Sequence, residues 1–198
     1  MSEQESTEGV DSRSAQWAEE NGVAYGAAQD NLIALASSFN AYIATIHTDN
    51  DGSQSIAKWL DIEPYGDPSN VPQVASDTVN SYAADSAKLA SESAQYIAHC
   101  NADNNAADSE NCIWSAKIEE VKNQYAALKA AADAYLILED SLLDALEGDE
   151  GDTQAAADPS AAPETITPAE LEARRAALGA EYGTARDAAL QVYQSSFE

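Results

Sequence analysis

Two cysteines and two histidines are the residues of this sequence best suited to chemistry. Cys100 and Cys112 flank the polar segment 101–111, and His99 adjoins the first cysteine. If two antiparallel helices meet at this segment, the two thiols come close enough to form a disulfide. Two free thiols are the alternative, because they are normal in a reducing cytoplasm. The sequence leaves both interpretations open.

These side chains do not match a known metal-binding pattern. Their spacing fits no four-ligand zinc site. A carboxylate-bridged di-iron bundle needs a glutamate three residues before a histidine, but Ala44 and Tyr96 occupy those positions before His47 and His99. The acidic run 149–152 lacks the ligand spacing of an EF-hand calcium loop. We therefore expect no metal and no cofactor.

No catalytic motif is evident. The sequence contains neither the G-x-S-x-G turn of a serine hydrolase nor a glycine-rich phosphate loop. Acid pairs are numerous, for example Glu119 with Glu120 and Glu139 with Asp140. In so acidic a chain we expect such pairs to lie on a solvated surface rather than to act as catalytic carboxylates. The sequence thus predicts a protein that is not an enzyme.

Aromatic side chains are the remaining candidates for a functional surface. The candidate interface residues are Trp59, Tyr82, Tyr96, Trp114, Tyr125, Tyr135, Tyr182 and Tyr193. Tyrosine and tryptophan are enriched where protein subunits meet. They would equally well thicken an alanine-rich core, with their hydroxyl groups reaching water at its edge. Both roles stay open.

Four helical segments would have to position these residues. Apolar residues recur every three or four positions over about 12–47, 72–100 and 111–146, which is the period of an amphipathic helix. The third segment has the strongest stripe, interrupted once, at Glu139. The stripe consists of Trp114, Ile118, Val121, Tyr125, Leu128, Ala132, Tyr135, Leu142 and Leu146. A fourth helix is predicted after Thr167, because Pro168 and Glu170 complete a capping box with proline at the first helical position.

The breaks between these segments set the domain organisation. We expect an acidic disordered arm over 1–11, a helical bundle domain over 12–147, a flexible linker over 148–166 and a C-terminal helix over 167–198. Gly22 and Gly26 predict a late start or a kink in the first helix. With a short helix near Trp59 and a hairpin of the second and third helices, the predicted fold is an all-α bundle of three to four long amphipathic helices.

The charge of the chain indicates the solvent in which it works. It has 35 Asp and Glu against 9 Lys and Arg, a formal net charge of −26. Self-repulsion of this size destabilises a compact state in dilute buffer, whereas in molar salt the Debye length falls to about 3 Å and screens the repulsion. The sequence therefore predicts a halophilic acidic surface. The rival explanation is an acidic surface that mimics nucleic acid or binds basic partners, but mimicry would favour clustered acids, and the acids are dispersed along the chain.

The remaining function classes are narrowed by elimination. The negative charge argues against direct binding of nucleic acid. No segment approaches the roughly 20 apolar residues of a membrane span, and the N-terminus lacks the features of a signal peptide. We expect synthesis in the cytoplasm, and exit from the cell only within an assembled particle such as a virion.

The favoured function is a structural or assembly protein of a halophile, with protein partners or self-association. A component of a haloarchaeal virus particle or of another multi-copy complex would fit. A cytoplasmic adaptor that binds a partner helix in a groove is the first alternative. An enzyme or metal protein with an unrecognised site is the second.

Overall fold

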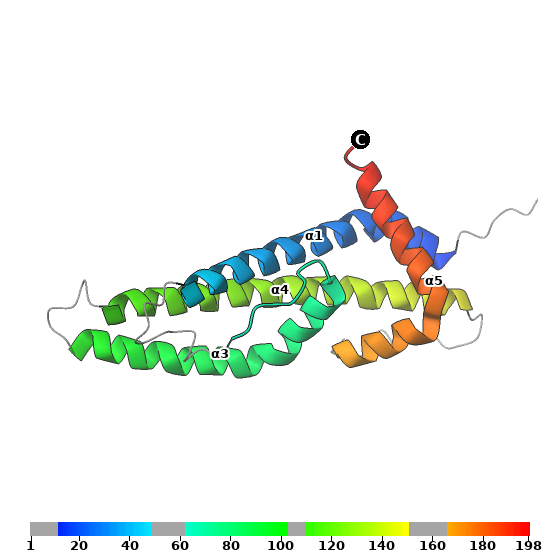
Figure 1. Ribbon diagram of the computed structural model, residues 1–198. Coiled ribbons are helices and arrows are strands. Elements are labelled where there is room, and N and C mark those ends of the chain that lie inside the picture. The colour runs from blue at the N-terminus through cyan, green and yellow to red at the C-terminus, as the bar shows by residue number, and fades with distance from the viewer. Residues whose placement is uncertain (1–11, 49–61, 103–109, 151–165) are drawn as a thin grey trace, which may run out of the picture. The chain divides into compact units, whose positions relative to one another are not determined.

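The computed structural model describes residues 12–48, 62–102, 110–150 and 166–198. These ranges contain four helices and no strand (Figure 1). The helices are α1 (Arg13–Thr48), α3 (Val71–Ala102), α4 (Glu110–Glu150) and α5 (Pro168–Ser195). The all-α bundle is confirmed, and the helix ends agree with the predicted ones to within a few residues. The expected arm over 1–11 and the short helix near Trp59 lie outside the described residues.

The predicted start of α5 is confirmed in detail. The hydroxyl of Thr167 accepts a hydrogen bond from the backbone N–H of Glu170, whose carboxylate accepts one from the N–H of Thr167. These two bonds satisfy backbone groups that the first turn of a helix leaves without partners. Pro168 occupies the first helical position, where its missing N–H costs nothing.

The end of α4 differs from the prediction. The helix continues to Glu150, so it includes the first residues of the segment that was expected to be a linker. Asp149 has a partner there, because its carboxylate accepts hydrogen bonds from the backbone N–H groups of Arg13 at 2.5 Å and Ser14 at 3.0 Å. The last turn of α4 thus caps the first turn of α1, and this contact favours the longer helix. Residues 151–165 lie outside the described part of the chain.

The chain forms two compact units whose boundary passes through two helices. Unit 1 consists of residues 1–27 and 137–198, and unit 2 of residues 28–136. Among the described residues, unit 1 contains the beginning of α1, the end of α4 and all of α5. Unit 2 contains the rest of α1, α3 and the longer part of α4.

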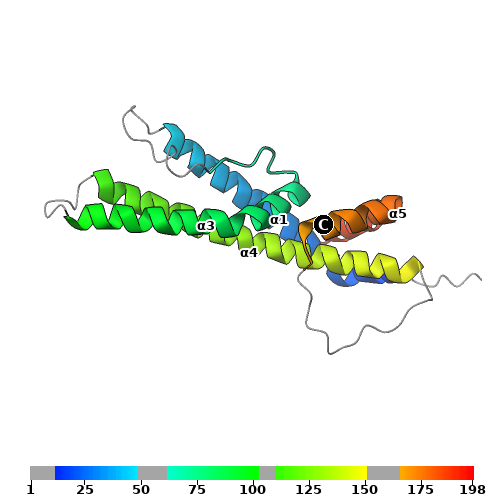
Figure 2. The ribbon, with the colours of Figure 1, turned by 90° about the horizontal axis from the view of Figure 1, so that it is seen from below.

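In unit 2, α3 and α4 lie side by side (Figures 1 and 2). Hydrogen bonds join Ser81 to Tyr125 and Ser93 to Glu119, so the two helices run antiparallel, as a hairpin requires. The predicted stripe of α4 is confirmed wherever its side chains are described. The buried apolar side chains of unit 2 are Leu32, Ala36, Phe39, Ile43, Ile46, Ile62, Val71, Val74, Ala75, Leu89, Ile118, Val121, Tyr125, Leu128, Ala131, Ala132, Tyr135 and Leu136.

In unit 1, α5 packs directly against the backbone of α1. A Cβ atom on Gly22 would lie 2.8 Å from the carbonyl oxygen of Ala189, and one on Gly26 would collide with the ring of Tyr193. Helix α1 begins before both glycines and continues through them, so the predicted late start is wrong. Packing is the physical reason: the missing side chains give α5 room, and the contact offsets the low helix propensity of glycine.

Helix α5 bends at Gly179. This residue has φ 55° and ψ −123°, a conformation that is open essentially to glycine alone. Figure 1 shows the two halves of α5 at an angle to each other. Each half buries its own side chains: Leu171 and Leu178 before the bend, and Tyr182 and Ala189 after it.

None of the described helices combines the length and the apolar character needed to cross a membrane.

Candidate functional site

Glu139 on α4 is a carboxylate with 0% exposure in the core of unit 1. The expectation that this residue lies on a solvated surface is wrong. Glu139 lies in the apolar stripe of α4, between Tyr135 and Leu142. Because the apolar side chains of this stripe face the core, the side chain of Glu139 faces the core as well. A buried carboxylate is costly unless it is paired and hydrogen-bonded, so its partners decide what it does.

Three side chains from two other helices meet this carboxylate. Arg175 of α5 donates a hydrogen bond from Nε to Oε1 of Glu139 at 2.5 Å, and Tyr25 of α1 donates one to Oε2 at 2.7 Å. The hydroxyl of Tyr182 donates a further hydrogen bond to Oε1. The guanidinium of Arg175 also lies 5.9 Å from the centre of the Tyr182 ring, within range of a cation–π interaction. We call these four residues the Glu139 cluster.

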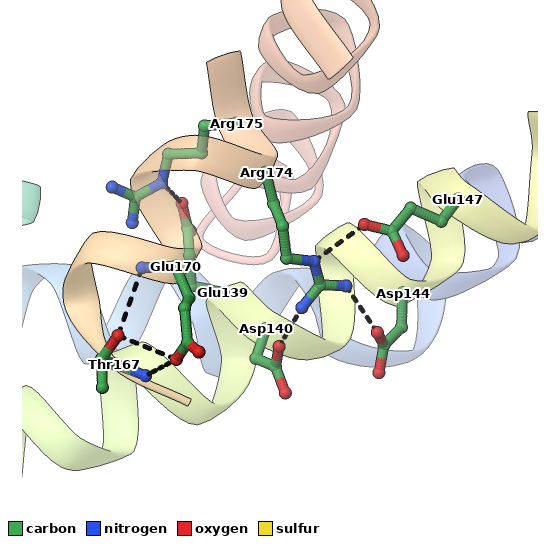
Figure 3. A network of polar contacts seen from close by, with 8 residues as sticks. All are labelled: Glu139, Asp140, Asp144, Glu147, Thr167, Glu170, Arg174 and Arg175. Atoms are coloured by element: carbon green, nitrogen blue, oxygen red, sulfur yellow. Dashed lines mark hydrogen bonds and ion pairs between the residues drawn. The ribbon is translucent and has the colours of Figure 1, made fainter. Parts of the chain in front are cut away.

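The neighbouring arginine forms a second, more exposed set of contacts with α4. Arg174 binds Asp140, Asp144 at 2.6 Å and Glu147 at 2.8 Å (Figure 3). Burial and the charge of Asp144 raise the pKa of Asp140, and Arg174 opposes this shift. The chain has only 9 basic residues, and two consecutive ones are thus used to hold α5 against α4.

The Glu139 cluster is suited to holding helices together rather than to transforming a substrate. Tyr25 is 0% and Tyr182 9% exposed, and the Arg175 side chain is 10% exposed. Burial, followed by the charge of Glu139, raises the pKa of Tyr182, so its hydroxyl stays protonated and continues to donate. A substrate could reach this carboxylate only if unit 1 opened.

Unit 2 contains a cavity of about 290 Å³, which we call the aromatic pocket. Its lining consists of Phe39, Ile62, Glu63, Pro64, Tyr65, Gly66, Asp77, Ser81, Asp85 and Tyr125. The ring of Phe39 stacks on that of Tyr125 with centres 5.7 Å apart, and its centre lies 5.9 Å from that of Tyr65. The pocket therefore combines three aromatic rings with three carboxylates.

Hydrogen bonds fix the two tyrosines of this pocket. Asn40 holds the backbone of Tyr65 through two bonds of 2.8 Å, one to its carbonyl and one from its N–H. The hydroxyl of Tyr65 shares a hydrogen bond of 2.7 Å with Thr78. The hydroxyl of Tyr125 donates to Asp85 at 3.0 Å and shares a 2.5 Å hydrogen bond with Ser81. Burial is the main cause that raises the pKa of both tyrosines.

A second cavity, of about 490 Å³, lies in unit 1. It is lined mostly by small side chains, and none of its described lining residues is aromatic. The lining residues are Ser12, Ser14, Ala15, Leu146, Asp149, Ala180, Glu181, Thr184, Ala185 and Ala188. Burial raises the pKa of Asp149, but hydrogen bonds from Ser14 and Arg13 outweigh this effect and lower the pKa overall. This carboxylate therefore serves as the cap of α1.

The structure describes the side chains of five of the predicted interface residues. The side chains of Tyr125, Tyr135 and Tyr182 are buried within their own units, so for these three the core role applies, and the hydroxyls of Tyr125 and Tyr182 bond to protein groups. Tyr82 and Tyr193 are half-buried. Tyr82 packs on Tyr125 at 5.2 Å and Tyr193 on Phe197 at 4.9 Å.

The side chains of the other predicted site residues lie outside the described part of the structure. Trp59 lies outside the described residues, and Tyr96 and Trp114 belong to helices whose backbone alone is described there. The same holds for Cys100, near the end of α3, and Cys112, near the start of α4, so their disulfide stays a prediction. Within the described ranges, no three His, Cys, Asp or Glu side chains gather in an arrangement that could hold a metal ion.

Sequence reasoning missed the Glu139 cluster and the aromatic pocket. One signal for the cluster was present, since an acid interrupts the strongest apolar stripe of a chain that also carries the adjacent pair Arg174 and Arg175. The pocket had no comparable signal, because its residues come from four separate segments. Comparison of the chain with models of protein families, with characterised proteins and with solved structures gives no match.

Proposed function

We propose that this chain is a non-enzymatic structural or assembly protein that works at high salt as part of a multi-copy complex, such as a virus particle of a halophile. The observation that carries the proposal is the Glu139 cluster. In this cluster the buried carboxylate, the guanidinium and the two hydroxyl groups are bonded to one another across three helices. Their contribution is to the stability of the packing.

The length and surface of the helices support the same proposal. Helix α4 has 41 residues, which corresponds to about 60 Å at a rise of 1.5 Å per residue. Such a helix offers much surface for contact with other copies in proportion to the core that it fills. Most acids of the described helices are exposed, Glu139 being the buried exception, and this distribution suits a protein that stays folded in concentrated salt.

The test is the native mass in solution. The full chain is separated by size exclusion in molar KCl, and its mass is measured by light scattering with and without reductant. We expect a defined oligomer, well above the 20.9 kDa of one chain. If reduction dissociates it, the double variant Cys100→Ser/Cys112→Ser should give the same smaller species without reductant. A monomer under every condition would contradict self-assembly and favour the adaptor alternative.

A further inference from the structure

The described part of unit 1 carries both an exposed aromatic side chain and an open apolar cavity that has room for one. We propose that Phe197 of one copy of the chain inserts into this cavity on a second copy. The cavity is the one of about 490 Å³ that Leu146 and several alanines of α1 and α5 line, and we call it the alanine groove. The inference rests on the proposed function, because it names the contact through which the copies would assemble.

Phe197 is both exposed and fixed in position. It is 73% exposed, the largest exposed fraction among the large hydrophobic residues that the structure describes. Its ring meets that of Tyr193 edge to face with centres 4.9 Å apart, and its backbone N–H donates a 3.2 Å hydrogen bond to the carbonyl of Gln194. Tyr193 in turn packs on the backbone of α1 at Gly26. The ring is therefore ordered before it meets a partner, which lowers the entropy lost on association.

The alanine groove has the size and the lining to receive such a ring. Its volume lies within the roughly 300–1,000 Å³ that is usual for ligand sites. Leu146 and Ala185 in its lining are buried, whereas Ala15 and Ala180 are exposed, so the cavity opens to solvent. The short alanine side chains leave space for a larger apolar group. Insertion of a phenyl ring removes apolar surface of both partners from water, which is favourable.

The charges near the two surfaces oppose this contact only weakly. Residues 188–197 carry no charged side chain, although Glu198 follows them. The groove has two acids in its described lining, Asp149 and Glu181, and Asp149 already caps the first turn of α1. The uncharged end of α5 can thus approach a second acidic copy, because molar salt screens the few charges that remain.

The ring and the groove of one copy cannot meet each other. Ala180 and Ala188 of the groove lie on the same continuous half of α5 that Phe197 follows. The ring lies about 13 Å beyond Ala188 along the helix axis, too far for its side chain to reach back. The extension of the end of α5 beyond α1 (Figure 1) leaves the ring open to another copy.

The contact is head-to-tail, since each copy offers one ring and one groove on different parts of its surface. Such contacts continue from copy to copy and give a ring or a filament. A single inserted aromatic side chain buries roughly 150–250 Å², well below the roughly 1,200 Å² of a stable pair of proteins. We therefore expect the assembly to depend on protein concentration.

Two single variants of the full chain test the contact by light scattering after size exclusion in molar KCl. Phe197→Ser removes the ring, and Ala15→Phe fills the groove from an exposed position of α1. We expect both variants to be monomers at concentrations at which the unchanged chain is assembled. The matched controls are Ile137→Ser, which removes a side chain that is 70% exposed, and Ala24→Phe, at an exposed position of α1 outside the described lining. Both controls should keep the mass of the unchanged chain.

An equimolar mixture of the two variants gives the sharpest result. Phe197→Ser keeps the groove and Ala15→Phe keeps the ring, so the mixture can form one contact and no second one. We expect a dimer of one copy of each variant, at the highest concentration at which each variant alone is a monomer. Absence of this dimer would overturn the proposal.

The other outcomes separate this contact from assembly itself. If the unchanged chain assembles and Phe197→Ser assembles equally well, another segment or partner fills the groove, so this contact is wrong while the assembly proposal stands. If the two controls dissociate as well, exposed apolar surface in general holds the copies together, and the contact is again wrong. A monomeric unchanged chain would contradict both proposals.

Discussion

At the scale of single residues, the ion pair between Glu139 and Arg175 is the contact whose loss should cost most. Their side chains are 0% and 10% exposed. Removal of one partner leaves the other charge buried without its counter-ion, at a cost of about 3–5 kcal/mol. We expect Glu139→Leu and Arg175→Leu each to lower the free energy of unfolding by about this amount, measured by chemical denaturation in molar KCl.

The double variant Glu139→Leu/Arg175→Leu tests whether the loss of stability comes from an unpaired buried charge or from changed packing. Replacement of both residues by leucine leaves no unpaired charge, so much of the loss should be recovered. The control is the ion pair between Arg186 and Asp187 on α5, whose side chains are 42% and 63% exposed. Arg186→Leu should change the free energy of unfolding by less than about 1 kcal/mol. If the losses of the two single variants simply add in the double variant, Glu139 and Arg175 are not coupled.

At the scale of elements, Gly179 decides the course of α5. Alanine is the better helix former by about 1 kcal/mol in a regular helix, but at φ 55° and ψ −123° a side chain introduces strain of about 1–3 kcal/mol. We therefore expect Gly179→Ala to lower the free energy of unfolding, although a Cβ atom there would meet no other atom within 4 Å. Urea denaturation in molar KCl measures the change.

Gly183 supplies the matched control, because it lies in the same helix, also has open space for a Cβ atom and has no positive φ. Gly183→Ala should stabilise the protein by up to about 1 kcal/mol. If Gly179→Ala lowers the free energy of unfolding and Gly183→Ala raises it, the bend at Gly179 is part of the native fold. Stabilisation by both would mean that α5 is straight in solution.

At the scale of the whole molecule, the net charge of −26 should make stability depend on salt. Screening shortens the range of repulsion from about 30 Å at 0.01 M to about 3 Å at 1 M salt. We expect the thermal midpoint to rise substantially from dilute buffer to molar KCl. A variant with Glu19, Glu120 and Glu181 changed to glutamine should depend on salt less steeply, since these exposed acids add to the repulsion. Equal stability in both buffers would contradict this account of the charge.

The sequence by itself determined which residues are helical, because the signals for helices are local. The apolar period of α4 and the capping box of Thr167, Pro168 and Glu170 each depend on residues within a few turns of one another. The ends of the four long predicted helices therefore agree with the structure to within a few residues. The division of α1 and α4 between two units was not foreseeable in the same way, since no break in the sequence marks it.

Only the tertiary structure decided what individual polar and small residues do. From the sequence, Glu139 is one surface acid among many, but in the structure Tyr25, Arg175 and Tyr182 surround its carboxylate. From the sequence, Gly22 weakens a helix, but in the structure it gives α5 room to pack against α1. The physical reason is the same in both cases. The free energy of a buried charge or of a missing side chain depends on the groups that it meets, and these come from helices far apart in the chain.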